Sequence, residues 1–225
     1  MVNVPNIITV ARVVLALVTL SMLFVAQGMD APLILTNGAS ISNAPNLIVR
    51  VDASHETILW IAFGLTVLVI WADGLDGYFA RKLKQTSKFG AILDIASDRC
   101  VELAYWIVFC ALQWIPAWVP LLFLVRGTFV DALRSHASEQ GLTAFGASTM
   151  MQSGLGKFLV ASNFSRFTYA VVKALAFCLV IAAHTQTLAN TIVSTVAIYL
   201  VYFSCFFCLV RGLPVLIDGQ SLFKA

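Results

Sequence analysis

The sequence predicts an all-helical integral membrane protein, an expectation that rests on composition, on the length of the apolar runs and on the placement of charge. Of the 225 residues, 60% are hydrophobic and only 11% are charged, and the mean hydropathy is +0.91. Soluble domains carry about 25% charged residues, so this chain is suited to hydrocarbon rather than to water. The net charge of +3 is small, and no basic block typical of nucleic-acid binding is present.

Six apolar runs approach the roughly 20 residues that a helix needs to cross the hydrocarbon layer. The first run lies near the N-terminus, where a signal peptide is an alternative. It lacks a basic start and contains Arg12, so we expect a retained helix. The predicted spans cover residues 6–27, 56–79, 89–112, 115–136, 166–187 and 190–212.

The basic residues predict the orientation, because cytoplasmic connections are enriched in Lys and Arg. The connections on the opposite side carry only Arg50. Six spans place both termini on one side, so we expect both termini and the active site to face the cytoplasm. The basic residues on that side are Arg81, Lys82, Lys84, Lys88, Lys157 and Lys224.

Two connections are long and polar. Residues 28–55 are predicted to lie on the outer side, as a surface loop. Residues 137–165 are predicted to lie on the inner side, where they either order over a substrate or serve as a linker. No internal repeat or second soluble domain is evident, so residues 1–225 are expected to form a single integral-membrane domain.

Four carboxylates gather between residues 73 and 98, within otherwise apolar runs. Helical spacing sorts them, with small residues, into two stripes. The first stripe is Asp73, Asp76, Gly77 and Ala80, and the second is Gly90, Asp94 and Asp98. If the two helices pack antiparallel with these stripes facing, four anions converge, and they remain ionised only if cations join them. Oxygen ligands without His or Cys favour Mg²⁺ or Mn²⁺.

This stretch resembles the signature of the class I CDP-alcohol phosphotransferases (CDP-alcohol phosphatidyltransferases), D-x2-D-G-x2-A-R-x8-G-x3-D-x3-D. The opening VPNIITVAR is also similar to the start of several members of that family. The resemblance implies transfer of a phosphatidyl group from CDP-diacylglycerol to an alcohol, with release of CMP. The eight matching positions are Asp73, Asp76, Gly77, Ala80, Arg81, Gly90, Asp94 and Asp98.

The resemblance also implies roles for individual residues. Asp73, Asp76 and Asp94 are the expected ligands of two divalent ions about 3.5–4 Å apart. Asp98 is the candidate general base for the acceptor hydroxyl and a further ligand. Small residues on these stripes are explained equally well by close helix packing. The residues expected to bind the CDP-lipid are Asn6, Thr9, Asp73, Gly77, Ala80, Arg81 and Gly90.

Glu102 lies one helical turn beyond Asp98, outside the signature. A carboxylate within a membrane span needs a partner or a wet cavity. We therefore expect Glu102 to pair with a cation on another helix, such as Arg126 or Lys173. Arg99 points away from Asp98 on the helix and is expected to be structural.

Cations in the second half of the chain indicate a phosphorylated acceptor. Arg126, Arg134, Lys157 and Arg166 are the expected phosphate ligands, and anchoring to lipid headgroups is the alternative role. Glycerol 3-phosphate is the leading acceptor, because the spacing of these cations loosely resembles phosphatidylglycerophosphate synthases. Inositol phosphate or inositol is the alternative, because the segment SDRC at residues 97–100 resembles inositol-using members.

Two other function classes are compatible with intramembrane carboxylates. A cation transporter would bind its ion there, but the acidic cluster lies near one membrane face and no inverted repeat is evident. A catalytically inactive lipid-binding homologue would not need all four aspartates. Members of the resembled family are commonly dimers, so a homodimer is also expected.

Overall fold

The computed structural model describes residues 4–27, 55–82, 88–139, 141, 151 and 153–219; within these ranges, the side chains of residues 75–81, 88, 139, 155 and 161 are left out. All regular structure in this part of the chain is helical, so the all-helical prediction is confirmed. The elements are α1 (Val4–Ala26), α2 (His55–Lys82), α3 (Lys88–Ala111), α4 (Trp118–Glu139), α5 (Gly154–Gly156), the π-helical turn η1 (Lys157–Ala161), α6 (Asn163–Ala182) and α7 (Ile192–Gly219).

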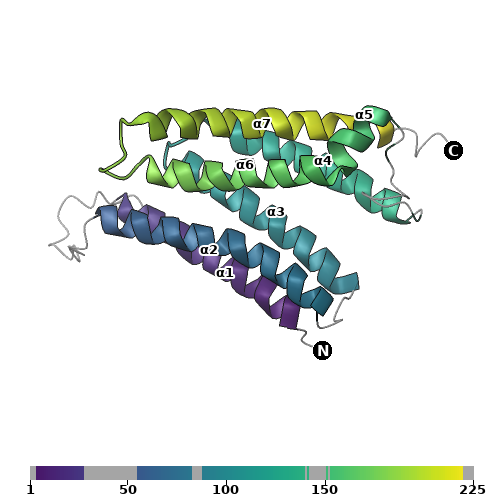
Figure 1. Cartoon of the computed structure of the whole chain (residues 1–225), viewed down its shortest axis with the longest axis horizontal. Coiled ribbons are helices and arrows are strands. Elements are labelled where there is room, and N and C mark those ends of the chain that lie inside the picture. Colours follow the sequence, from purple (N-terminus) through teal and green to yellow (C-terminus); the bar gives the residue numbers. More distant parts are fainter. Residues whose placement is uncertain are drawn as a thin grey trace, which may run out of the picture.

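The long helices form two groups, and α3 slants between them (Figure 1). α1 packs along α2 in one group, while α7 packs against α4 and α6 in the other. α3 contacts α1 on one side and α4 on the other. The N-terminal end of α1, the ends of α2 and α3 that adjoin residues 83–87, and the C-terminal end of α7 all lie at the same end of the molecule (Figure 1).

α1 is apolar on almost every side, yet only one of its faces is buried against the rest of the protein. Pro5 lies in its first turn, where proline is tolerated because no intrahelical N–H bond is lost. A narrow stripe that includes Thr9, Arg12 and Ala16 is buried, whereas apolar residues such as Val14 and Leu17 remain exposed. The buried stripe carries the polar groups, so α1 turns them inward and presents hydrocarbon to the lipid.

An aromatic cluster fixes the middle of α3. The rings of Tyr105 and Phe177 stack with centroids 4.8 Å apart, and those of Trp106 and Phe123 stack at 5.0 Å. The hydroxyl of Tyr105 donates to Thr66 Oγ1 over 3.1 Å. Since these partners belong to α2, α4 and α6, α3 is anchored to both helix groups a few residues after Glu102.

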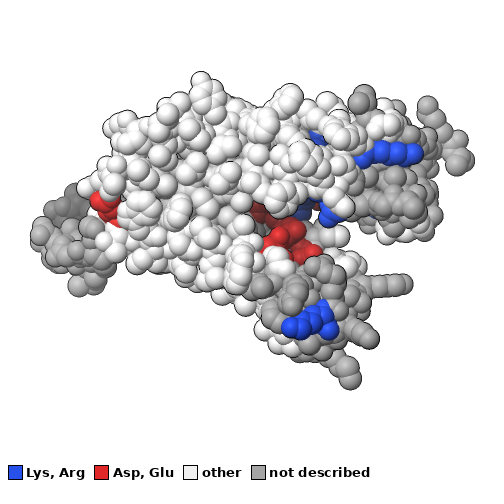
Figure 2. Space-filling model, viewed as in Figure 1, with Lys and Arg blue, Asp and Glu red and all other residues white. Residues whose placement is uncertain are grey.

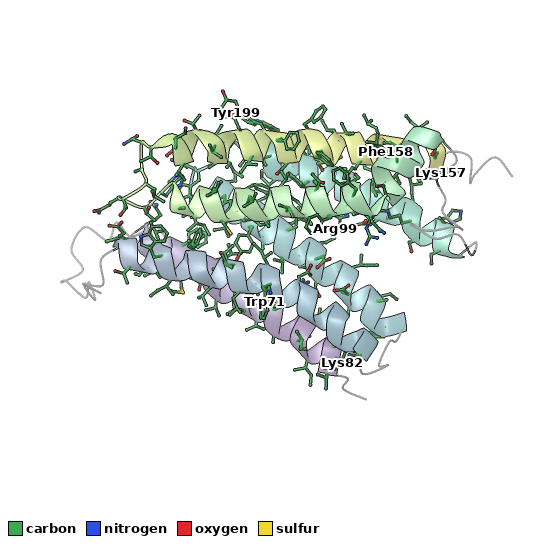
Figure 3. The ribbon with its side chains drawn as sticks, in the orientation of Figure 1. Trp71, Lys82, Arg99, Lys157, Phe158 and Tyr199 are labelled. Carbon is green, nitrogen blue, oxygen red and sulfur yellow. The ribbon has the colours of Figure 1, made fainter. Side chains whose placement is uncertain are left out.

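The protein is an integral membrane protein, since four helices in the described part of the chain are long and apolar enough to cross a membrane. These are residues 4–26, 55–74, 163–182 and 192–219. The predicted third and fourth spans correspond to α3 and α4, which are helices of 24 and 22 residues with more charged side chains. Large apolar side chains such as Trp71 and Tyr199 lie on the outer surface (Figure 3).

Of the two long connections, residues 28–54 lie outside the described part of the chain. The second, predicted over residues 137–165, includes α5 and η1, and Arg211 holds η1 against α7. This buried guanidinium donates to the carbonyls of Leu159 over 2.9 Å and Val160 over 3.2 Å, and to Ser165 Oγ over 2.6 Å. Arg211 therefore stabilises a π-helical turn.

Candidate active site

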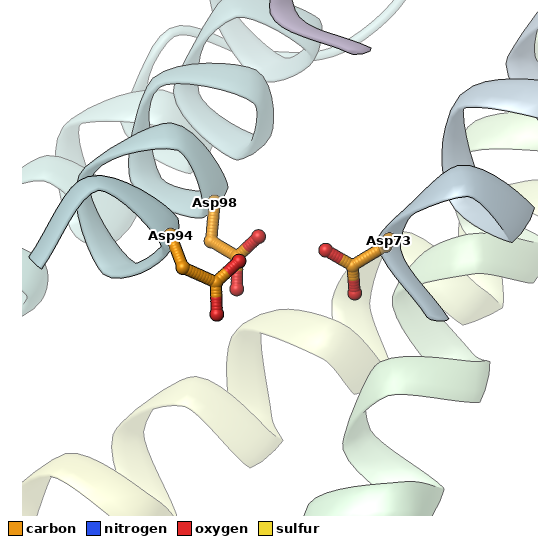
Figure 4. Close-up of side chains that lie close together, drawn as sticks. All are labelled: Asp73, Asp94 and Asp98. Atoms are coloured by element: carbon orange, nitrogen blue, oxygen red, sulfur yellow. The ribbon is translucent and has the colours of Figure 1, made fainter. Parts of the chain in front are cut away.

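Three of the four predicted acidic ligands converge at one end of the molecule. Asp73 on α2 faces Asp94 and Asp98 on α3 (Figure 4), and one carboxylate oxygen from each lies within 4.8 Å of the others. The helical turn between Asp94 and Asp98 places both on the same face of α3. Asp76 belongs to α2, but its side chain lies outside the described residues.

Arg12 on α1 joins the two acidic helices. Its Nη2 donates to Asp98 Oδ1 over 2.6 Å, and its Nη1 forms an ion pair with Asp73. The Arg12 side chain is only 3% exposed, whereas those of Asp73 and Asp98 are 49% and 52% exposed. In the described residues α1 packs against both α2 and α3 and joins them.

Sequence reasoning missed this role of Arg12. The available signal was a cation at the middle of an apolar run, in a chain whose acidic residues also lie in apolar runs. A buried guanidinium needs a charged partner, and acidic residues on neighbouring helices supply it.

The donor set of this cluster fits a divalent ion. Its groups are hard carboxylate oxygens, which suit Mg²⁺ and Mn²⁺. Three carboxylates and one guanidinium leave a net charge of −2, which one divalent ion neutralises. The side chains of Asp73 and Asp98 are about half exposed, so an ion from solution can reach them.

The other residues expected at the CDP-lipid site are described in part. Asn6 is half-buried on α1, and the hydroxyl of buried Thr9 donates to the Pro5 carbonyl of the same helix over 3.0 Å. Gly90 is half-buried on α3, on the side of the helix that carries Asp94. The side chains at the remaining expected positions, Gly77, Ala80 and Arg81, lie outside the described residues.

A hollow opens between the two helix groups, and acidic and basic side chains both line it (Figure 2). The buried carboxylate of Glu102 on α3 pairs with Lys173 Nζ on α6 over 2.7 Å, as expected. Arg99 Nη1 contacts Glu102 over 2.8 Å, and Arg99 Nε contacts Asp131 over 2.7 Å. Arg99 therefore faces α4 and α6 from α3 (Figure 3).

The four cations expected to bind the acceptor phosphate separate into two places. Arg126 on α4 is 8% exposed, and within the described residues its Nε lacks a hydrogen-bond partner. Arg134, half-buried on the same helix, lies 3.8 Å from Asp131. Lys157 and Arg166 are exposed, on η1 and α6, beside the segment that Arg211 holds.

The sequence is also similar to a family of known proteins. The family model described as CDP-alcohol phosphatidyltransferase matches residues 2–210. The chain belongs to the CDP-alcohol phosphatidyltransferase family. The matched range includes all four motif aspartates, Arg12 and the basic residues of α4 and α6.

Several curated relatives in this family are similar to parts of the chain. The CDP-diacylglycerol–glycerol-3-phosphate 3-phosphatidyltransferase of Bacillus subtilis is 31% identical over 137 residues, covering 60% of this chain and 61% of the relative. The protein of the same name from Cereibacter sphaeroides is 37% identical over 78 residues, covering 33% and 35%.

A relative with a different acceptor in its name also matches. The CDP-diacylglycerol–inositol 3-phosphatidyltransferase of Candida albicans is 42% identical over 48 residues, covering 21% of this chain and 20% of the relative. In each case the chain spans less than two thirds of the relative's length.

Proposed function

We propose that the protein transfers a phosphatidyl group from CDP-diacylglycerol to glycerol 3-phosphate and releases CMP. The observation that carries this proposal is the convergence of Asp73, Asp94 and Asp98, together with a hollow that acidic and basic side chains line (Figure 2). Family membership supports the reaction class, and the names of the relatives from Bacillus subtilis and Cereibacter sphaeroides support the acceptor. In the reaction, the acceptor oxygen forms a bond to the lipid-side phosphorus, and the bond from that phosphorus to CMP breaks.

We assign the acidic groups as follows. Asp73, Asp76 and Asp94 hold one or two Mg²⁺ or Mn²⁺ ions, with Asp98 as a further ligand. When bound, these ions neutralise the diphosphate oxygens and stabilise the leaving CMP. Asp98 Oδ1 accepts a hydrogen bond from Arg12, so Oδ2 is the atom that we assign to take the proton of the acceptor hydroxyl.

The acceptor phosphate is assigned to the basic side of the hollow. Arg99, Arg126, Arg134 and Lys173 form one cluster with the carboxylates of Glu102 and Asp131. Four cations and two carboxylates leave a net charge of +2. A phosphate monoester carries about −1.5 to −2 at pH 7, so glycerol 3-phosphate matches this charge. We assign Arg126 and Arg134 as its ligands, with Lys157 and Arg166 at the entrance.

The membrane arrangement belongs to the same proposal. α3 and α4 complete six spans, with both termini and the acidic cluster at the cytoplasmic face. Both helix groups contribute to the hollow (Figure 2), which supports one domain over residues 1–225. We also propose a homodimer, in line with the resemblance to dimeric family members; crosslinking in native membranes tests it.

The decisive experiment uses the full chain reconstituted in liposomes that contain CDP-diacylglycerol. With Mg²⁺ or Mn²⁺, glycerol 3-phosphate is expected to drive CMP release and formation of phosphatidylglycerophosphate, identified by lipid mass spectrometry. EDTA is expected to abolish both products. Absence of CMP release with glycerol 3-phosphate, inositol phosphate and inositol alike would refute the proposal.

Inositol phosphate or inositol is the second candidate acceptor, favoured by the relative from Candida albicans and by the SDRC segment. A phosphatidylinositol-type product in the same assay, without a glycerophosphate product, would identify it. Uptake of Mn²⁺ into liposomes that lack any CDP-lipid would instead support a cation transporter.

Asp94→Asn tests the assignment of the acidic cluster. The amide keeps the shape of the side chain but loses the charge that attracts a divalent ion, so CMP release should fall by at least about 100-fold. Binding of Mn²⁺, followed by electron paramagnetic resonance, should weaken in parallel. Glu56→Gln, at the opposite end of α2, serves as the matched control. Turnover of Asp94→Asn at the unaltered rate would contradict the assignment.

A further inference from the structure

Glu102 is a buried carboxylate that the proposed chemistry does not use, on the wall of an anion site. Its side chain is 6% exposed. A buried negative charge beside a phosphate-binding cluster opposes phosphate binding, so its presence needs a compensating role.

Both carboxylate oxygens of Glu102 are occupied by cations from different helices. Oε1 accepts from Lys173 Nζ on α6 over 2.7 Å, and Oε2 accepts from Arg99 Nη1 on α3 over 2.8 Å. Arg99 also binds Asp131 on α4 through Nε at 2.7 Å and Nη2 at 3.3 Å. The network therefore ties α3, α4 and α6 together at one level.

That level lies next to the reacting groups. Arg99 directly follows Asp98 in α3, and Glu102 lies one turn further along. In Figure 1, α3 diverges from α4 and α6 towards its N-terminal end, and the hollow opens on that side (Figure 2). The network thus lies where the three helices separate. It fixes the distance from α3, which carries Asp98, to α4 and α6.

The ion pair with Glu102 also restrains the side chain of Lys173. An ammonium group has three N–H donors, and Glu102 takes one of them. The ammonium further lies 4.4 Å from the ring centroid of Tyr169. A long side chain that would otherwise sample many rotamers is therefore held in one position, with donors remaining for an anion.

We propose that Glu102 is a positioning residue that holds Lys173 and Arg99 in place beside Arg126 and Arg134, the assigned ligands of the acceptor phosphate, so that it sets the affinity for the acceptor and not for the CDP-lipid. This inference rests on the proposed function. Glu102 acts through its two partner cations and does not touch the reacting atoms.

Glu102→Gln distinguishes positioning from a simple countercharge by the sign of its effect. If Glu102 were only a countercharge, its neutralisation would strengthen phosphate binding and lower the KM for glycerol 3-phosphate. Positioning predicts the opposite, a rise of about tenfold in that KM, because a neutral amide holds the cations less firmly. The KM for CDP-diacylglycerol should stay within about twofold.

Lys173→Met tests whether Glu102 changes the acceptor KM by acting through Lys173. In that background, Glu102→Gln should raise the acceptor KM by a clearly smaller factor than in the unaltered chain, because the two residues act as one unit. If Glu102→Gln fails to fold in detergent, the double variant removes the ion pair without leaving Lys173 half-buried and unpaired. Its acceptor KM should then lie close to that of Lys173→Met. Glu56→Gln is again the control with an exposed carboxylate.

The outcomes separate the two proposals. A chain without turnover on any acceptor refutes the proposed function, whatever the variants do. An active chain refutes the role of Glu102 if Glu102→Gln lowers or preserves the acceptor KM, changes both KM values equally, or adds its full effect to that of Lys173→Met.

Discussion

At the scale of single residues, the site is organised by cations that lie between carboxylates. Arg12 bridges Asp73 and Asp98, while Arg99 bridges Glu102 and Asp131. Guanidinium suits both places because its planar array of donors spans two acceptors, which a single ammonium group does less well.

Arg12→Met should destabilise the metal-free protein. Removing the guanidinium leaves three close carboxylates without their fixed cation, and we expect a loss of about 1–3 kcal/mol, less than for a fully buried pair because the aspartates are half exposed. Added Mn²⁺ supplies positive charge, so the thermal unfolding midpoint should rise more with Mn²⁺ in the variant than in the original chain.

Arg12→Lys provides the control for this measurement. It retains the charge but cannot span both carboxylates in the same way, so its midpoint should lie between those of the original chain and Arg12→Met. Equal Mn²⁺-induced shifts in all three proteins would show that Arg12 does not act on the acidic cluster.

At the scale of helices, close packing decides where a buried cation can lie. Gly212 on α7 lies against Arg126 of α4, and a Cβ at position 212 would lie 2.8 Å from Arg126 Cγ and 3.2 Å from its Nε. The absence of a side chain at this glycine therefore admits the Arg126 side chain into the space between α4 and α7.

Gly212→Ala should displace Arg126 from this position. We expect a stability cost of about 1–3 kcal/mol from overpacking, together with a rise of several-fold in the KM for glycerol 3-phosphate. Gly64→Ala on α2 is the matched control, since a Cβ there meets nothing within 4 Å and alanine favours the helix. Unchanged kinetics in Gly212→Ala would remove Arg126 from the acceptor site.

The helices could be predicted from hydropathy, but their ends could not. The fifth run was predicted over residues 166–187, whereas α6 covers Asn163–Ala182. Its start is set by Ser162, which accepts from Ser165 N, and hydropathy does not detect such a cap. The sixth run was predicted to end at 212, yet α7 continues through Pro214 to Gly219.

The candidate site, like the helices, could be predicted from the sequence only in part. The acidic cluster could be predicted because its residues lie within 26 positions at helical spacing, and the Glu102–Lys173 pair because a buried carboxylate needs a cation. The pairing of Arg12 with Asp98, 86 residues apart, and of Arg99 with Asp131, 32 residues apart, depends on which helices pack together. That choice is made by tertiary packing and is not encoded in local spacing.

At the scale of the whole molecule, the charged groups of the site lie towards one end of an otherwise apolar body. Lys82 and Lys157 mark that end (Figure 3), where the N-terminal end of α1 and the C-terminal end of α7 also lie (Figure 1). Stacked Trp114 and His184, with ring centroids 4.0 Å apart, belong to the connections at the other end.

The proposed orientation is tested with single cysteines in a background that lacks the native ones. Lys82→Cys and Gln186→Cys lie on exposed positions near opposite ends. In sealed inside-out vesicles, a membrane-impermeant thiol reagent should label position 82 and not position 186, and right-side-out vesicles should give the reverse. Labelling of both positions from one side would rule out the six-span arrangement.

The position of Arg12 on the first helix has a consequence for biosynthesis. Asp73, Asp94, Asp98 and Arg12 are all translated before α4, α6 and α7, which bring the second set of cations. While the chain is inserted, the guanidinium of Arg12 can already neutralise part of the charge of these aspartates. The first three helices therefore do not depend on later helices for a counterion. Arg99 and Glu102 acquire their remaining partners, Asp131 and Lys173, only when α4 and α6 follow, so that network assembles after the acidic cluster.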